Sequence, residues 1–411
     1  MDYFKKFDNG LRLVVSKIEG MTSVSFGVLV KTGSVNENEK NNGISHFIEH
    51  TVFKGTDKRS AFDISDGIDR IGAQINAFTS KEITCYYTKS TTERFPESAE
   101  IISDIFFNAR FDSVELEKEK GVIIEEINMS EDTPEDLCLD VLAESYFGKS
   151  GLGRPILGSA ANVKSFTKKD VLAYMKDFYT ADNVVISVAG AIEPKDAEKV
   201  VSEYFVNKFK YSIAVKPVIK MQNFSDNLFK TKKIEQSHIA LAYKAIKVND
   251  ERKYAFSLAN VVLGGGMSSR LFQKIREEMG LCYTVYSYPS AYEAEGVLDV
   301  YAGVNTDSRN KAFDEIIKLV KEFVKTGITE SEFLRAKEQV KSSFILGRES
   351  TASQMLLYGK NLLFSGEVFD YKKEMEKVNA ITLEDVNEAI KVIDPDCFAT
   401  ATVGPLKTPL K

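Results

Sequence analysis

A strand, glycine and turn pattern occurs twice in this 411-residue chain, about half the chain apart. Residues 183–194 (NVVISVAGAIEP) predict a buried strand, then a glycine, then a helix that begins at Pro194. Residues 397–407 (CFATATVGPLK) repeat the apolar strand, the glycine and the turn. A repeat with this spacing indicates a chain built from two related units.

Alignment of the two halves gives nearly the same offset at two separate places. Residues 50–55 (HTVFKG) match residues 260–265 (NVVLGG) at an offset of 210, and Gly190 matches Gly404 at an offset of 214. A chain of this length is also longer than one hydrophobic core usually supports. Both observations predict two α/β domains.

The expected N-terminal domain covers residues 1–212, and the expected C-terminal domain covers residues 218–411. Hydrophobic periodicity and turn residues predict the elements of the first domain. Its strands are expected at residues 11–16, 24–31, 74–88 (one or two strands) and in the first part of 183–194. Its helices are expected after residue 42 as far as Gly55, and at residues 61–71, 96–108 and 113–129.

Composition argues against a nucleic-acid or membrane partner. The chain is 43% hydrophobic and 28% charged, which predicts a packed core, and its net charge of −6 comes without a dense basic block. No stretch approaches the roughly 20 apolar residues that cross a bilayer, and the first residues do not resemble a secretory signal. Cys85, Cys138, Cys282 and Cys397 show no CxxC spacing, so neither a disulfide framework nor a thiolate zinc site is expected. The cytoplasm is the expected location.

Two of the three histidines, His46 and His50, lie within the segment HFIEH. On a helix, positions i and i+4 place both imidazoles on one face, at a separation that one metal ion can bridge. Glu49 flanks the same face. Metal-assisted hydrolysis needs a Lewis acid that lowers the pKa of water and a base that accepts its proton. The segment therefore predicts a zinc site with Glu49 as the general base.

The alternative is an accidental HxxEH on a solvated helix, because surface histidines beside a glutamate usually bind nothing. Phe47, Ile48, Val52 and Phe53, however, make this helix largely apolar. Both histidines are therefore expected to lie at least partly inside the protein, where their ring nitrogens need partners. This expectation favours metal binding.

A catalytic zinc ion needs a third protein ligand from another segment. His238 is a candidate, but it begins a strand of the second half and is interpreted as structural. The helix expected over residues 113–129 offers Glu119 and Glu126 within an apolar arc formed by Leu116, Val122, Ile123, Ile127 and Met129. Carboxylates in an apolar face are costly unless paired or bound to a cation. One of the two glutamates is therefore predicted to bind the metal, and the other to orient a histidine.

Four segments resemble, in the same order, the sequence blocks of the M16 metallopeptidases, the inverted-zincin family of insulin-degrading enzyme, pitrilysin and the mitochondrial processing peptidases. They are residues 46–56 (HFIEHTVFKGT), 76–87 (NAFTSKEITCYY), 119–136 (EKGVIIEEINMSEDTPED) and 152–158 (LGRPILG). The resemblance covers essentially the whole chain and is to the short branch of bacterial and mitochondrial processing proteases. It implies an insulinase-like zinc metalloendopeptidase with one Zn2+ per chain.

The resemblance also assigns roles to single residues in the first half. The family's spacing between the second histidine and the zinc-binding glutamate selects Glu126 as the third ligand beside His46 and His50. It gives Glu119 a supporting catalytic role.

The second half resembles the family's non-catalytic repeat. The positions that align with the three motif residues hold Phe256, Ala259 and Asn260, which cannot bind zinc. Arg276 and Tyr283 match an arginine and a tyrosine that family enzymes direct to the substrate carbonyl, where they are suitable donors to a developing oxyanion. Without the resemblance, a surface arginine and a core tyrosine would be the simpler interpretation.

The fold implied by the resemblance is α+β, with two homologous α/β units, each an antiparallel sheet with helices packed on it, forming half of a clamshell chamber. Residues 78–87 resemble the edge strand that receives the peptide, and Asn76, Ala77, Phe78 and Thr79 are the expected substrate-binding residues. Strand addition uses backbone hydrogen bonds, so it accepts many extended peptides and unfolded segments. In this branch two chains close the chamber, so a homodimer is expected, with a heterodimer containing an inactive paralogue as the alternative.

Two other functions remain open at this point. Some family members are non-catalytic partners or core subunits of larger complexes, but these usually lack an intact HxxEH. A zinc hydrolase that acts on something other than peptides has only the generic motif in its favour. The sequence favours a peptidase and does not separate precursor processing from peptide degradation.

Overall fold

The computed structural model describes residues 2–209, 213–215 and 225–405. The chain forms two compact units, and each unit contains segments from both halves of the sequence. The first unit comprises Met1–Ile127, Pro155–Val218 and Leu346–Asp370, and the second comprises Asn128–Arg154, Ile219–Ile345 and Tyr371–Lys411. The expected domain boundary, between residues 212 and 218, falls mostly outside the described residues.

The first unit is built on a mixed sheet. Its strands are β1 (Tyr3–Lys6), β2 (Arg12–Lys17), β3 (Ser23–Val30), β4 (Gln74–Thr79), β5 (Thr84–Thr91) and β6 (Val184–Gly190). Within the described residues the strand order is β1-β2-β6-β3-β5-β4, so β4 is an edge strand. Neighbouring strands are antiparallel except β2 and β6, which are parallel. The parallel pair is possible because a long connection, which contains β3, β4, β5 and several helices, separates these two strands in the chain.

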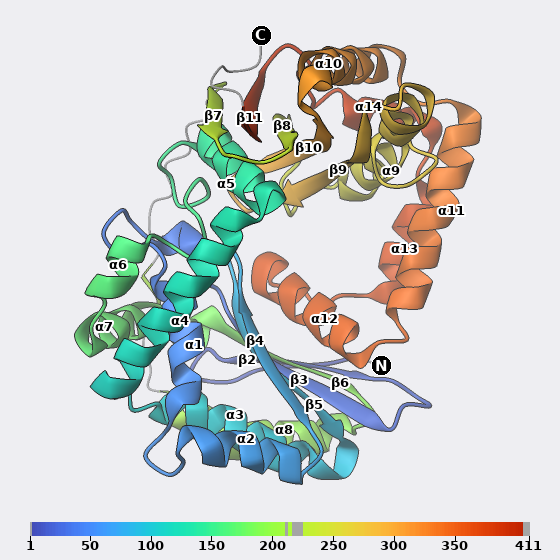
Figure 1. The fold of residues 1–411 in the computed structure, drawn as a ribbon. Helices are drawn as coiled ribbons and strands as arrows, with labels where there is room; N and C mark the ends of the chain where they lie inside the picture. The colour runs from blue at the N-terminus through green and yellow to red at the C-terminus, as the bar shows by residue number, and fades with distance from the viewer. Residues whose placement is uncertain (1, 210–212, 216–224, 406–411) are drawn as a thin grey trace. The chain divides into compact units, whose positions relative to one another are not determined.

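Helices cover both faces of this first sheet (Figure 1). The helices of this unit are α1 (Ile44–Thr51), α2 (Ala61–Arg70), α3 (Phe95–Asn108), most of α4 (Ser113–Asp132), α6 (Ala160–Ser165), α7 (Lys168–Phe178), α8 (Pro194–Tyr204) and α12 (Thr351–Ser365). One hydrophobic core joins the inner side chains of the sheet to α1, α2, α3, α7 and α8. The opposite face is covered by α12, which comes from the C-terminal half of the chain.

Specific contacts hold α12 against the first sheet. The hydroxyl of Ser187 on β6 donates a hydrogen bond of 2.7 Å to the carbonyl oxygen of Met355. The guanidinium of Arg12 on β2 donates one of 3.2 Å to the carbonyl oxygen of Leu362. Gly27 on β3 allows the close approach, because a Cβ atom there would lie 2.3 Å from the sulfur of Met355. The position of α12 is therefore fixed within the first unit.

The second unit has a related sheet. Its strands are β7 (Asn227–Thr231), β8 (Gln236–Ala245), β9 (Cys282–Ala291), β10 (Gly296–Asn305) and β11 (Phe398–Gly404). In the described part of the chain the order is β7-β11-β8-β10-β9, with β7 and β11 parallel and the other pairs antiparallel. The two segments with the repeated sequence pattern form β6 and β11, and each lies beside a parallel partner.

The helices of the second unit include one from the N-terminal half of the chain. They are α5 (Pro134–Phe147), α9 (Lys253–Leu263), α10 (Arg309–Thr326), most of α11 (Glu330–Gly347), α13 (Tyr371–Ala380) and α14 (Leu383–Ile390). The hydroxyl of Ser145 on α5 donates a hydrogen bond of 2.7 Å to the carbonyl oxygen of Asp226, beside β7. Each sheet thus carries one helix supplied by the other half of the sequence. None of the helices in the described residues has the length and apolar character of a membrane span.

Candidate metal centre

The start of α1, the helix that carries HFIEH, is fixed by a buried carboxylate. Glu37 accepts hydrogen bonds from the backbone N–H groups of Gly43 (2.7 Å) and Ser45 (2.9 Å). These bonds satisfy donors that a helix N-terminus leaves without partners, and the negative charge suits that end of the helix. Gly43 has a φ of 99°, and a Cβ atom there would lie 2.7 Å from the carbonyl oxygen of Leu157. Glycine is therefore required where the chain enters the helix.

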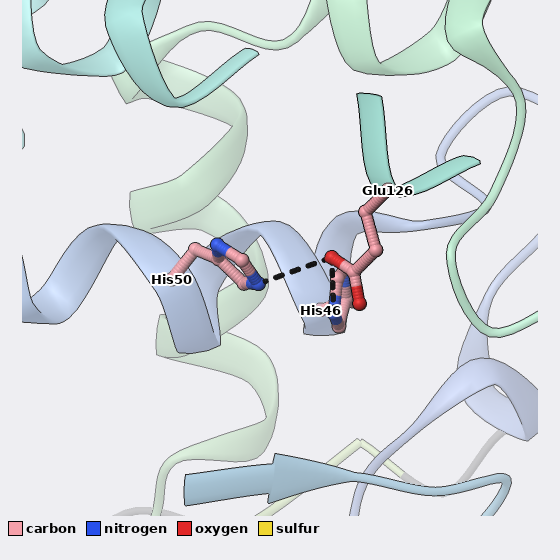
Figure 2. A group of neighbouring side chains, drawn as sticks. All are labelled: His46, His50 and Glu126. Carbon is pink, nitrogen blue, oxygen red and sulfur yellow. Dashed lines mark ion pairs between the residues drawn. The ribbon is translucent and has the colours of Figure 1, made fainter. Parts of the chain in front are cut away.

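His46 and His50 on α1 come together with Glu126 on α4, and each offers one ligand atom within 4.8 Å of the others (Figure 2). The Nε2 atoms of His46 and His50 lie 3.6 Å and 3.5 Å from the same oxygen of Glu126. Tetrahedral zinc, with bonds of about 2.0–2.2 Å, holds neighbouring ligand atoms about 3.3–3.6 Å apart. The two nitrogens and one carboxylate therefore match both the ligand types and the spacing that zinc requires.

Burial and charge set the protonation of this group. His46 is 6% exposed, and its burial, followed by the nearby charge of His50, lowers its pKa. Burial also disfavours charge on His50, but hydrogen bonds to Glu119 and Glu126 outweigh that effect and raise the pKa of His50. The hydrogen bond from His50 lowers the pKa of Glu126. The acid is thus held ionised, as a metal ligand must be.

Glu119 contacts His50 through its Nδ1 atom and is not one of the three candidate metal ligands. One of its oxygens is 3.3 Å from Nδ1 of His50, and the other is 2.7 Å from the ammonium group of Lys54. Burial would raise the pKa of Glu119, but its bonds to His50 and Lys54 dominate and lower it. A carboxylate on the second ring nitrogen fixes the orientation and tautomer of a ligating histidine. The structure therefore places Glu126 in the metal group and Glu119 behind it.

The apolar arc predicted for α4 is narrower than expected. Leu116 and Ile123 are buried, but Val122 is 51% and Met129 is 69% exposed, so their predicted place in the arc is wrong. The stripe of buried and half-buried residues follows positions 116, 119/120, 123 and 126/127, which recur at intervals of three and four residues. Val122 is one residue, or about 100°, away from the centre of that stripe.

Glu49 faces the edge strand of the first sheet. The hydroxyl of Thr79 on β4 donates a hydrogen bond of 2.6 Å to a carboxylate oxygen of Glu49. Burial raises the pKa of Glu49, and the Thr79 bond acts in the opposite direction. The predicted substrate-binding residues 76–79 all lie on β4, with Asn76 exposed and the other three partly exposed. The expectation that residues 78–87 form one edge strand is wrong, because the chain turns after Thr79 and residues 84–87 belong to the inner strand β5. The candidate base and the candidate peptide-binding strand are therefore in direct contact.

The other predicted site residues belong to the second unit. Nδ1 of His238 lies 2.6 Å from the hydroxyl of Tyr301, and His238 is not part of the metal group. Arg276 lies on a π-helical segment, Phe272–Glu278, with its guanidinium 4.8 Å from the ring centroid of Tyr283. Tyr283 is 75% exposed, so it is not a core tyrosine. The pair is accessible to solvent, as a pair that contacts a ligand must be.

Sequence reasoning missed two residues that position the site. Lys54 follows His50 by four residues, a spacing that places side chains on the same side of a helical turn and could have indicated the contact with Glu119. No local signal identifies Glu37, because it caps α1 from a loop.

An HxxEH helix completed by a glutamate from a second helix is the arrangement of the inverted zincins. Two family profiles match the chain: "Insulinase (Peptidase family M16)" over residues 12–160 and "Peptidase M16 inactive domain" over residues 165–340. The chain belongs to peptidase family M16, as its motifs predicted.

Close relatives span nearly the whole chain. The uncharacterized zinc protease YmxG of Bacillus subtilis is 42% identical over 400 residues, which cover 97% of both chains. An uncharacterized zinc protease of Streptomyces coelicolor is 34% identical, over 97% of this chain and 88% of the relative. Similar proteins thus carry the name of zinc protease.

Solved structures confirm the two-domain α/β fold. A protease from Helicobacter pylori has a TM-score of 0.91 at 22% identity and covers 98% of this chain and 99% of its own. A peptidase M16 inactive domain from Pseudomonas fluorescens has a TM-score of 0.92 at 19% identity and covers 100% of both chains. At these identities the similarity concerns the fold alone.

Proposed function

We propose that this chain is a zinc-dependent endopeptidase that cleaves peptides or unfolded segments bound as an extended strand along β4. The observation that carries the proposal is the convergence of His46, His50 and Glu126, with ligand atoms within 4.8 Å of one another, beside Glu49. Zinc held by these three residues would act as a Lewis acid that lowers the pKa of water and polarises the peptide carbonyl.

The chain's own residues supply the proton transfer. Glu49 accepts a proton from the attacking water and passes it to the leaving amine, a role that suits a carboxylate whose pKa is raised by burial. The hydroxyl of Thr79 fixes one oxygen of Glu49 and leaves the other free for this exchange. Glu119 holds the ring of His50 in place.

The open edge of β4 supports binding of an extended substrate. In the described residues β4 pairs with β5 alone, so the backbone groups along its other edge are available to a peptide strand. Backbone pairing would orient the peptide without demanding a particular sequence. Arg276 and Tyr283 are proposed to donate hydrogen bonds to the substrate carbonyl, because both are polar and the phenol is exposed.

We further propose a homodimer that closes a chamber around the substrate. The chain carries both an HxxEH group and the Arg276 and Tyr283 pair, so two identical copies would bring every required residue. A heterodimer with an inactive paralogue is the alternative. Analytical ultracentrifugation of the purified chain measures its mass in solution, and a dimer mass supports the homodimer.

A non-catalytic partner or core subunit is the second candidate function, because one structure with the same fold is named as an inactive domain. The complete HxxEH and its glutamate argue against it. A protein without catalysis has no need for a buried His46 that faces an ionised Glu126.

Glu49→Gln separates the two functions. The variant keeps all three proposed ligands, so metal content measured by mass spectrometry should equal that of the wild type. Cleavage of a quenched fluorogenic peptide library should fall at least about 1,000-fold, because the base is lost. A chelator should abolish wild-type cleavage, and added Zn2+ should restore it. Cleavage that is insensitive to both the chelator and Glu49→Gln would refute the peptidase proposal.

A further inference from the structure

The edge strand β4 presents its side chains to two different environments. Ile75 and Ala77 pack on the core that contains α1, and Thr79 contacts Glu49 on that same side. Because side chains alternate along a strand, Asn76 and Phe78 face the other side of the sheet, where α12 packs against β2, β3 and β6. A peptide added to β4 would alternate in the same way, so every second side chain would face α12.

Lys360 of α12 stands over this second side. Its ammonium group lies 5.6 Å from the ring centroid of Phe78, and the Phe78 ring lies 6.3 Å from that of Tyr87 on β5. Lys360 is exposed and forms no ion pair with any residue that the structure describes. A charge in this position can accept a new partner without first breaking an existing salt bridge.

A second lysine lies on the same face of the sheet. Lys89 on β5 lies directly opposite Gln74 of β4, and Gln74 is on the same face of the strand as Phe78, four residues before it. Lys89 is also exposed. It too has no ion-pair partner within the described ranges. None of the six strands of this sheet contains Asp or Glu, and Lys360 is the one acidic or basic residue of α12. The chain has a net charge of −6, so this basic face contrasts with the protein as a whole.

We propose that Lys360, assisted by Lys89, forms a subsite that selects acidic side chains on the α12-facing side of a peptide bound along β4. This inference rests on the proposed peptidase function and specifies its substrate class. Residues directly opposite on neighbouring strands have Cβ atoms about 5 Å apart. A glutamate opposite Phe78 therefore reaches the ammonium group of Lys360, while the Phe78 ring packs against its methylene groups.

The test uses fluorogenic peptides that differ only by Glu, Gln or Lys at one position, scanned across the cleavage site. For the wild type, kcat/KM should be about fivefold higher for the peptide with Glu than for the peptide with Lys at one of the scanned positions. That ratio corresponds to the upper end of the free energy contributed by one exposed ion pair. Lys360→Glu should reverse that preference. The preference should also weaken in high salt, because exposed charges are screened.

Matched variants separate a charge effect from damage to the fold. Lys176 is exposed on α7, so Lys176→Glu changes the net charge equally and should leave the preference unchanged. Lys360→Met keeps the apolar stem and should remove the preference without reversing it. If the midpoint of thermal unfolding of each variant equals that of the wild type, the fold is retained.

Binding measured without turnover keeps this inference separate from the peptidase proposal. Measured by fluorescence anisotropy, zinc-loaded Glu49→Gln should bind the Glu peptide more tightly than the Lys peptide. The double variant Glu49→Gln, Lys360→Glu should bind the Lys peptide more tightly. If no peptide is cleaved but this order holds, the peptidase proposal fails and the subsite stands. Equal binding of all peptides, or a preference that survives Lys360→Glu, would overturn the subsite.

Discussion

The ammonium group of Lys54 lies 2.7 Å from one oxygen of Glu119, and the other oxygen of Glu119 lies 3.3 Å from Nδ1 of His50. Lys54, on the turn after α1, is thus linked through Glu119 to His50, a proposed zinc ligand. Glu119 is 5% exposed, and a carboxylate at that depth needs a cationic partner to stay ionised. Lys54 is that partner, so it controls the orientation of His50 without touching the metal group.

Replacing Lys54 should therefore weaken metal binding. Lys54→Met leaves Glu119 with one partner, and loss of an outer support of this kind lowers metal affinity by about 10- to 100-fold. Competition with a chromogenic zinc chelator measures the change. Lys54→Arg keeps the charge and should retain affinity within about threefold of the wild type. Equal affinity in the Met and Arg variants would show that Lys54 has no positioning role.

Glu126 and its neighbour Glu125 provide a matched pair on α4. Glu126→Gln removes a charged ligand, so the protein should lose stoichiometric zinc on dialysis. Glu125 is exposed and outside the metal group, and Glu125→Gln should keep one zinc per chain. Elemental analysis of the two dialysed proteins gives the comparison. Full zinc content in Glu126→Gln would contradict the ligand assignment.

Thr79 should affect the rate more than metal binding. Thr79→Val removes the 2.6 Å hydrogen bond to Glu49, and loss of a hydrogen bond to a charged group costs about 1.5–3 kcal/mol. We expect kcat to fall about tenfold or more while zinc content is unchanged. Thr79→Ser keeps the hydroxyl and should recover most of the rate. A normal kcat in Thr79→Val would mean that Glu49 does not depend on this contact.

Asp299 should make the stability of the second unit depend on pH. It lies on β10 opposite Tyr288 of β9, and burial raises its pKa from 3.8 to about 7, although the Tyr288 hydroxyl lowers it in part. The folded state therefore keeps a proton that the unfolded state releases. The stabilisation is complete below about pH 4 and is lost as the pH rises through 7, at about 1.4 kcal/mol per pH unit.

Comparison with Asp299→Asn isolates this dependence from the other titrating groups. The asparagine is uncharged at every pH, so the free energy of unfolding of the variant should rise relative to the wild type between pH 4 and pH 7. Urea unfolding at a series of pH values measures the difference. Parallel pH curves for the two proteins would show that Asp299 is already ionised in the folded state.

Local geometry is the reason that part of the metal site can be predicted without a structure. The i and i+4 spacing of His46 and His50 places both rings on one face of any helix. Periodicity also narrowed the third ligand to Glu119 or Glu126, because both lie on one stripe of α4. It could not separate them, since each is equally close to that face, and family spacing supplied the choice. The apolar arc predicted for α4 is too wide at Val122 and Met129, because the width of a buried face depends on what packs against the helix.

Contacts between distant segments of the chain depend on the fold as a whole. Lys360 reaches Phe78, and Arg12 bonds the carbonyl oxygen of Leu362 across 350 residues of chain, because α12 packs on a sheet built mainly from the N-terminal half. In the same way α5 packs on the other sheet. No local pattern encodes such an exchange, because it depends on the path of the whole chain rather than on the spacing of neighbouring residues. The pairing of His46 and His50 follows from helix geometry alone, whereas the meeting of Glu126 with these histidines and of Lys360 with Phe78 on β4 follows from the fold.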